Sequence, residues 1–201
     1  MDVGVLFGVV GISVGVYFGL ENRRLNKGLR TFDWPQIESG VRYLSTLIEQ
    51  EYQPDLIVCS SAGSVGVVAN LYVTYTPRFV PLYMGVSRSK VGSAFTSSPL
   101  FPKRYETNRW ETFLPDGLAA TGARKVLILE DVVLSGETMR EIVSLLIEEG
   151  FTREQIKTAA LFGTSFGANQ GQAPDFYWRE LPDTDFYLPW GRSLGKGHQR
   201  V

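Results

Sequence analysis

The segment from Lys125 to Met139, KVLILEDVVLSGETM, constrains the fold of this chain more than any other part. An apolar run leads into the acidic pair Glu130 and Asp131, and a short apolar step separates this pair from a turn that contains glycine. The turn opens an amphipathic helix. A strand, a turn and a helix in this order predict one βα unit of a mostly parallel α/β sheet.

The same segment predicts a binding site for a sugar phosphate. Backbone N–H groups of the turn and of the helix start suit a phosphate dianion. The two carboxylates before them can accept hydrogen bonds from the vicinal hydroxyls of a ribose. The alternative is an ordinary βα turn, in which Ser135 is the helix N-cap and the acids are solvated.

Other parts of the chain continue the alternation of helices and apolar strands. We expect a helix that starts near Asp33 and Pro35, a strand at 56–59, a helix at 65–72 and a strand at 158–162. The small-residue turn at 60–64 and the turn at 130–138 both follow strands. Ligands of such sheets bind at the carboxyl ends of the strands, so both turns are expected to face one ligand with two phosphate groups.

Two further segments have a different character. Residues 87–122 show little periodicity, which is typical of a functional or mobile loop. Residues 3–20 carry no charge and include five glycines, and as a helix they would measure about 27 Å, close to the thickness of a bilayer core. The basic residues that follow are Arg23, Arg24, Lys27 and Arg30.

We therefore predict a transmembrane anchor at 1–22, a basic linker at 23–30 and a ligand-binding domain at 31–201. The positive-inside rule would make the protein a single-pass protein of the inner membrane with this domain in the cytoplasm. A buried first strand or a core helix is the alternative interpretation of 3–20.

Charge and composition exclude several classes of function. The formal net charge of −1 argues against a large nucleic-acid surface. The single cysteine, Cys59, excludes an internal disulfide. With only one histidine, His198, the chain also lacks the residues for a Cys/His metal site, and a Ser-His-Asp triad is not expected.

The segment 125–139 resembles the motif with which type I phosphoribosyltransferases bind phosphoribosyl pyrophosphate (PRPP). Residues 34–71 are similar to the N-terminal part of the purine enzymes of that family, and the segments 174–177 and 189–191 resemble their C-terminal hood. The resemblance implies a parallel sheet flanked by helices, a mobile loop at about 87–122, Mg²⁺ bound together with PRPP, and a homo-oligomer.

The resemblance also implies roles for individual residues. The catalytic pair Glu130 and Asp131 would bind the ribose hydroxyls, and no residue is assigned as a direct metal ligand. The remaining contacts follow, each group with its implied partner: Ser135, Gly136, Glu137 and Thr138 for the 5′-phosphate; Ser61, Ala62, Gly63 and Ser64 for the pyrophosphate; Phe186, Tyr187 and Trp190 for stacking on the base.

Three positions depart from the pattern of the purine enzymes. Leu134 stands where many carry an acidic residue, Gly163 where many carry a lysine, and Ala62 where many carry a basic residue. Two hypotheses follow, namely a membrane-anchored enzyme that transfers phosphoribosyl between PRPP and a purine base, and a catalytically degenerate sensor of PRPP or a nucleoside monophosphate. A third, weaker hypothesis is a membrane effector controlled by the ligand domain.

Overall fold

The computed structural model describes residues 30–60, 64–89, 103–106, 110–169, 171–182 and 186–193. The chain divides into two units, one of residues 34–183 and one formed by the two ends of the chain. The predicted anchor at 3–20 lies outside the described residues. Within the ranges that are described, no helix combines the length and the apolar character needed to cross a bilayer.

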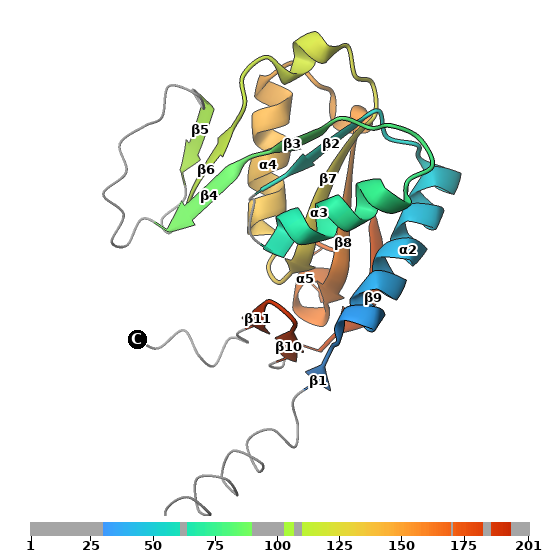
Figure 1. Cartoon of the computed structure of the whole chain (residues 1–201). Helices are drawn as coiled ribbons and strands as arrows, with labels where there is room; N and C mark the ends of the chain where they lie inside the picture. The colour runs from blue at the N-terminus through green and yellow to red at the C-terminus, as the bar shows by residue number, and fades with distance from the viewer. Residues whose placement is uncertain are drawn as a thin grey trace, which may run out of the picture. The chain divides into compact units, whose positions relative to one another are not determined.

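A five-stranded sheet forms the centre of the larger unit (Figure 1). Its strands run in the order β3 (Leu82–Met84), β2 (Leu56–Cys59), β7 (Val126–Val133), β8 (Ile156–Thr164) and β9 (Phe176–Leu181). All four neighbouring pairs are parallel. The prediction of a mostly parallel α/β sheet is therefore confirmed.

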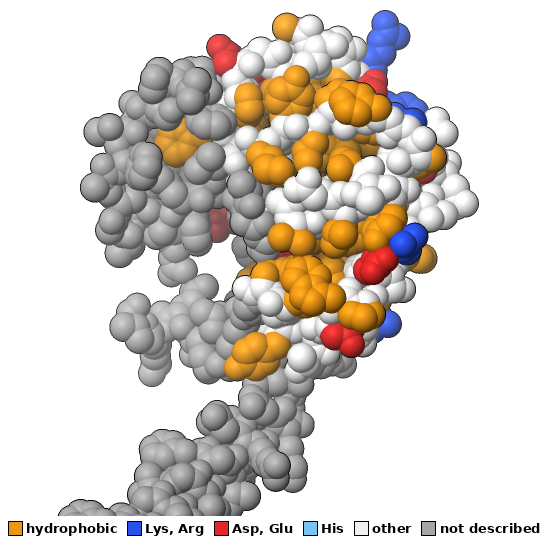
Figure 2. All heavy atoms as spheres, in the orientation of Figure 1, with side chains coloured by type: hydrophobic (Ala, Val, Ile, Leu, Met, Phe, Trp, Pro, Cys, Tyr) orange, Lys and Arg blue, Asp and Glu red, His pale blue; other side chains and the backbone are white. Residues whose placement is uncertain are grey.

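Helices cover both faces of this sheet (Figure 1). The helices α2 (Trp34–Glu51) and α3 (Ser64–Tyr75) lie on one face, and α4 (Glu137–Glu148) lies on the other. A short helix, α5 (Ser165–Asn169), follows β8. Apolar side chains are spread over the face that carries α3, a helix without charged residues, whereas α2 exposes the Glu38–Arg42 ion pair (Figure 2).

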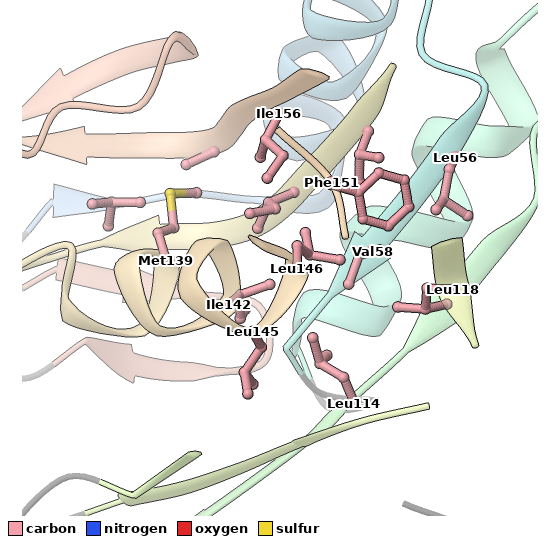
Figure 3. Packing of buried hydrophobic residues seen from close by; sticks show 14 residues of the cluster. Leu56, Val58, Leu114, Leu118, Met139, Ile142, Leu145, Leu146, Phe151 and Ile156 are labelled. Atoms are coloured by element: carbon pink, nitrogen blue, oxygen red, sulfur yellow. The ribbon is translucent and has the colours of Figure 1, made fainter. Parts of the chain in front are cut away.

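The face that carries α4 holds an apolar cluster (Figure 3). Leu56 and Val58 of β2 and alternate residues of β7 meet the inner side of α4, which begins at Glu137 and ends at Glu148. Alternation is expected because successive side chains of a strand point to opposite faces. The α4 residues in this cluster are Met139, Ile142, Leu145 and Leu146, with Val143 at its margin.

A second sheet gives regular secondary structure to parts of 87–122, the region that was expected to be a functional or mobile loop with little periodicity. The described parts of this region form antiparallel strands in the order β4 (Val86–Ser89), β6 (Trp110–Leu114) and β5 (Lys103–Glu106). A 3₁₀ turn at Leu118–Thr121 follows. These strands obtain their hydrogen bonds by antiparallel pairing, in the case of β4 and β6 between segments that are distant in the sequence, and local periodicity does not record such pairing.

The smaller unit contains three short strands, β1 (Arg30–Thr31), β10 (Phe186–Leu188) and β11 (Gly191–Ser193). β1 pairs with β10 in parallel, and β10 pairs with β11 in antiparallel fashion. The backbone N–H of Phe32 extends the first pairing by donating to the carbonyl of Tyr187 at 2.9 Å. The first strand therefore pairs with a strand more than 150 positions later in the sequence.

The segment 174–177 does not belong to this smaller unit, which corrects its expected place in the hood. Phe176 and Tyr177 begin β9, the edge strand of the main sheet. Asp175, just before β9, accepts hydrogen bonds from the backbone N–H and the hydroxyl of Thr158 on β8, both at 2.8 Å. The segment therefore belongs to the main sheet of the larger unit.

Candidate functional site

The acidic pair lies in the second half of β7, which extends four residues further than the apolar run alone predicts. Strand β7 ends at Val133, and the turn from Leu134 to Gly136 leads directly into α4. The order of strand, acids, turn and helix expected from the sequence is thus present at the carboxyl edge of the parallel sheet, where ligands of α/β sheets bind.

Glu130 is almost completely buried, with 6% of its surface exposed. The parallel register pairs Leu129 with Cys59, so Ser60 follows β2 at the level of Glu130. The Ser60 side chain, itself buried, forms a hydrogen bond with the Glu130 carboxyl group. Among the described residues, no group bonds to the second carboxyl oxygen, Oε1.

The environment of Glu130 changes its acidity. Burial raises the pKa of Glu130 to about 8, and the nearby charge of Asp131 acts in the same direction. The hydrogen bond from Ser60 lowers this pKa, but burial outweighs it. The surroundings of Glu130 therefore favour its protonated, uncharged form.

Asp131 differs from Glu130 in exposure and in bonding. It is half-buried, and its Oδ1 accepts the backbone N–H of Val132 at 2.8 Å. Because successive residues of a strand point to opposite faces, the two members of the acidic pair do not present their carboxyl groups to the same surroundings.

The turn before α4 is held by a segment that follows β8. Gly136 has a φ of 71°, and a Cβ at this position would lie 2.7 Å from the Cβ of Gln172. The hydroxyl of Thr164 donates to the carbonyl of Leu134 at 2.8 Å, and it accepts the N–H of Gly167 at 3.2 Å. The conformation of the turn is thus determined by neighbours as well as by its own glycine.

The other predicted phosphate residues lie at the start of α4. The Ser135 hydroxyl accepts the backbone N–H of Glu137 at 3.4 Å, Glu137 is exposed, and Thr138 is half-buried. The first N–H groups of a helix have no intrahelical partner, so those that follow Glu137 can bind an anion.

The structure describes only part of the second turn. Ser61, Ala62 and Gly63 lie outside the described residues, whereas Ser64 is the first residue of α3. The Glu130–Ser60 contact joins the acidic pair to the residue that begins this turn. Sequence analysis placed both turns at one sheet edge but did not single out Ser60 as a contact, since a serine in a small-residue turn carries no distinguishing signal.

The residues predicted to stack on a base belong to the smaller unit. Phe186 is buried with 2% of its surface exposed, and Tyr187 and Trp190 are half-buried. Their role stays a prediction.

The structure describes two of the three positions that depart from the pattern of the purine enzymes. Leu134 is exposed in the turn before α4, with 41% of its surface accessible. A Cβ at Gly163, near the end of β8, would lie 3.6 Å from the ring of Tyr177. Neither position carries a charge.

Among the described residues, no group of three His, Cys, Asp or Glu side chains is placed to hold a metal ion.

Comparisons with known proteins agree on one family. The family model described as "Phosphoribosyl transferase domain" matches residues 30–193. Hypoxanthine-guanine phosphoribosyltransferases of Mus spretus and Mus musculus are each 32% identical to the chain over 68 residues, which is 34% of this chain. The match spans 31% and 30% of these two relatives, less than a third of their length.

Solved structures share the fold at low sequence identity. The purine phosphoribosyltransferase from Pyrococcus horikoshii has a TM-score of 0.56 at 16% identity, covering 82% of this chain and 95% of that one. A hypothetical protein from Neisseria gonorrhoeae with bound ppGpp also has a TM-score of 0.56 at 16% identity, with coverages of 81% and 89%. The xanthine-guanine-hypoxanthine phosphoribosyltransferase of Helicobacter pylori has a TM-score of 0.53 at 14% identity, with coverages of 81% and 93%.

Proposed function

This chain belongs to the phosphoribosyltransferase family, and from that premise we propose that it transfers a phosphoribosyl group between PRPP and a purine base. One observation carries the proposal: the parallel register of β2 against β7 sets Ser60, the residue after β2, beside the buried Glu130, and the turn before α4 follows β7 at the same end of the sheet. A phosphorylated pentose requires all three of these parts.

Different residues bind different parts of the PRPP molecule and the base. Backbone N–H groups of 135–138 bind the 5′-phosphate, and the Asp131 carboxylate accepts hydrogen bonds from the ribose hydroxyls. The turn at 61–64 binds the pyrophosphate, and Mg²⁺ arrives with PRPP, because this ion commonly binds through phosphate oxygens and keeps several of its waters. From the resemblance alone, base stacking is assigned to Phe186, Tyr187 or Trp190.

The reaction breaks the bond between C1 of the ribose and a pyrophosphate oxygen, and it forms a bond from C1 to a ring nitrogen of the base. The pyrophosphate leaves with the electron pair, and the nitrogen of the base loses a proton. Positive charge builds up on the ribose in the transition state. The protein contributes positioning of both reactants and a negative charge near the ribose.

A second function is favoured by one observation among the comparisons. The Neisseria gonorrhoeae neighbour holds ppGpp, a nucleotide with phosphate groups at two positions. Two helix-opening turns at one sheet edge suit such a ligand. Leu134 and Gly163 are uncharged, so the contacts that an acidic residue and a lysine at these positions would make with a purine during catalysis are missing. The alternative is therefore a nucleotide sensor that binds the ribose and its phosphates through the same residues.

Turnover separates the two functions. The full-length chain is mixed with PRPP, Mg²⁺ and hypoxanthine, guanine or adenine, and pyrophosphate release is followed. Release with any base supports the enzyme. Heat of binding for ppGpp or a nucleoside monophosphate, without pyrophosphate release, supports the sensor.

A matched variant links either result to the site. Asp131→Asn keeps the size of the side chain but removes the charge that meets the ribose, and it is expected to weaken binding about 100-fold. If wild-type protein gives no heat with PRPP, ppGpp or a nucleoside monophosphate at millimolar concentration, both functions are excluded.

Membrane attachment is part of the same proposal. Residues 3–20 anchor the chain in the inner membrane, with the ligand-binding domain on the cytoplasmic side and two or more copies associated. Deletion of residues 1–22 should transfer the protein from the membrane pellet to the soluble fraction. An unchanged distribution between the two fractions would contradict the anchor.

A further inference from the structure

We propose that Thr164 is a positioning residue: its hydroxyl group fixes the turn before α4, and with it the backbone N–H groups that bind the 5′-phosphate. Thr164 is the last residue of β8 and is not among the site residues expected from the sequence. The inference rests on the proposed function for the identity of the ligand, whereas the contacts themselves are part of the fold.

The register of the main sheet brings Thr164 to this turn. β7 and β8 pair Val133 with Gly163, so Leu134, the first residue after β7, is level with Thr164. Thr164 itself still pairs with Leu181 of β9, and only 3% of its surface is exposed. A buried side chain on a paired strand has a fixed position, so it can fix the irregular segment beside it.

The hydroxyl of Thr164 makes two hydrogen bonds of opposite sense. It donates to the carbonyl of Leu134 at 2.8 Å, and it accepts the backbone N–H of Gly167 at 3.2 Å. A hydroxyl group has one O–H to donate and can also accept, so these bonds use both of its abilities. Valine is similar in shape and can make neither bond, whereas serine can make both.

The connection between β8 and β9 supports the same turn at a second point. A Cβ at Gly167 would lie 3.1 Å from the carbonyl oxygen of Leu134, and a Cβ at Gly136 would lie 2.7 Å from that of Gln172. The backbone N–H of Gln172 donates to the carbonyl of Gly167 at 2.8 Å, which joins the two contacts. The turn is therefore packed against this connection at both of its ends.

A fixed turn matters because the phosphate site consists of backbone groups. Each N–H carries only a partial charge, so a phosphate dianion is bound well when several of them point at it together. The turn also supplies the carbonyl of Gly136 that accepts the N–H of Arg140 at 3.0 Å, at the start of α4. Because Thr164 orders the turn before the ligand arrives, binding does not have to bear that entropic cost.

Ribose 5-phosphate is the probe for this turn, because it carries the 5′-phosphate and lacks the pyrophosphate. In the full-length protein, Thr164→Val is expected to weaken its binding about tenfold in calorimetry, since both hydrogen bonds of the hydroxyl are lost. Thr164→Ser should restore the affinity to within about threefold of wild type. Binding of pyrophosphate with Mg²⁺, which is assigned to the turn at 61–64, should change less than about twofold in Thr164→Val.

Thr76→Val is the matched control for Thr164→Val. Thr76 is also buried, and its hydroxyl donates to the carbonyl of Tyr72 at 2.9 Å. It follows α3, at the opposite end of that helix from the ligand-binding turns. Thr76→Val should lower the melting temperature and leave the affinity for ribose 5-phosphate unchanged. An equal loss of affinity in the two valine variants would overturn the inference, as would wild-type affinity in Thr164→Val.

Gly167→Ala tests the same contact if Thr164→Val does not fold. Its Cβ would lie 3.1 Å from the Leu134 carbonyl oxygen, so that carbonyl has to move relative to the Thr164 hydroxyl. Weaker binding of ribose 5-phosphate with unchanged binding of pyrophosphate supports the inference. Unchanged binding of both ligands overturns it.

Hydrogen exchange of the ligand-free protein separates this inference from the proposed function. The amide of Arg140 should exchange faster in Thr164→Val than in wild type or Thr76→Val, because its acceptor belongs to the turn. If the exchange rises in this way but wild type binds neither ribose 5-phosphate nor PRPP, Thr164 positions the turn and the proposed function fails. If the amide exchanges equally in all three proteins, the inference fails.

Discussion

The carboxyl groups at the two ends of the parallel strands of the five-stranded sheet are bonded differently. The amino edge is the end at which these strands begin, and the carboxyl edge is the end at which they stop. At the amino edge, Asp55 accepts the backbone N–H groups of Arg124 and Lys125 at 2.9–3.1 Å. Asp175 bonds to Thr158 and to the Lys157 ammonium group at 2.8 Å. At the carboxyl edge, Glu130 is buried with one carboxyl oxygen that has no partner among the described residues.

The acidity of the carboxyl groups follows this division. Burial alone would raise the pKa of Asp175, but hydrogen bonds from Lys157 and Thr158 outweigh it and hold the pKa below its usual value. For Glu130 burial prevails, and its pKa rises to about 8. The amino edge therefore holds carboxylates in hydrogen bonds that stabilise the fold, whereas the carboxyl edge holds a buried carboxyl group whose pKa is raised.

The largest effect is expected at the turn of the carboxyl edge. Gly136→Ala would force a residue with a side chain into a φ of 71° and place its Cβ 2.7 Å from that of Gln172. We expect a loss of about 2–4 kcal/mol in the free energy of unfolding, measured with denaturant, together with weakened PRPP binding.

Gly117→Ala is the matched control for this substitution. Gly117 has a φ of 74°, but nothing lies within 4 Å of a Cβ built there. Its cost should be about 1 kcal/mol, from the backbone conformation alone. Equal losses of unfolding free energy for the two substitutions would mean that Gln172 does not restrain the turn before α4.

The next effect tests the amino edge. Asp175→Ala removes hydrogen bonds to Lys157 and Thr158, and we expect a loss of about 2–3 kcal/mol in the free energy of unfolding at pH 7. Ligand affinity measured by calorimetry should stay within about twofold, because the residue lies at the edge away from the ligand. A strong loss of ligand affinity without a loss of stability would contradict the assignment of a purely stabilising role to the amino edge.

The two edges should also respond oppositely to pH. A lowered carboxyl pKa gives Asp175 a stabilising effect that is lost as pH falls below the usual carboxyl range, whereas the raised pKa of Glu130 lowers stability as pH rises toward 8. One proton contributes a slope of at most about 1.4 kcal/mol per pH unit. Denaturant unfolding of wild type, Asp175→Ala and Glu130→Gln between pH 3 and 9 measures both slopes, and a slope of the same sign at both ends would contradict the comparison.

The smallest effect concerns the other aspartate of the amino edge. Asp55→Asn replaces a carboxylate that accepts two backbone N–H groups far away in the sequence, so about 1 kcal/mol of unfolding free energy should be lost. Asp116→Asn is the control, since Asp116 accepts only the adjacent N–H of Gly117 at an exposed position and should change stability by less than about 0.5 kcal/mol. Equal effects would show that the bonds between strands add nothing at Asp55.

Local pattern was sufficient to predict much of the fold. The apolar run at 126–129 and the acids, turn and helix that follow are present in the predicted order, and α2 begins at Trp34, where a helix start near Asp33 and Pro35 was predicted. These features depend on side chains within a few positions of one another, so the sequence encodes them directly.

The features that were missed all involve partners distant in the sequence. The strands in 86–114 form by pairing with one another, and the segment 174–177 joins β8 because Asp175 bonds to Thr158. Gln172 restrains Gly136 from a loop after α5. Hydropathy and spacing carry no record of such contacts, so they could not be predicted from one sequence.

The acidic pair shows the same limit within two adjacent residues. The sequence by itself determined that two carboxyl groups and a glycine turn stand at the carboxyl edge of a parallel sheet. Only the tertiary structure decided that Glu130 lies buried beside Ser60 while Asp131 is half-exposed. The physical reason is that the charge of a carboxyl group depends on its burial and its bonding partners, and both are set by the register of β2 against β7 and by the packing of α4.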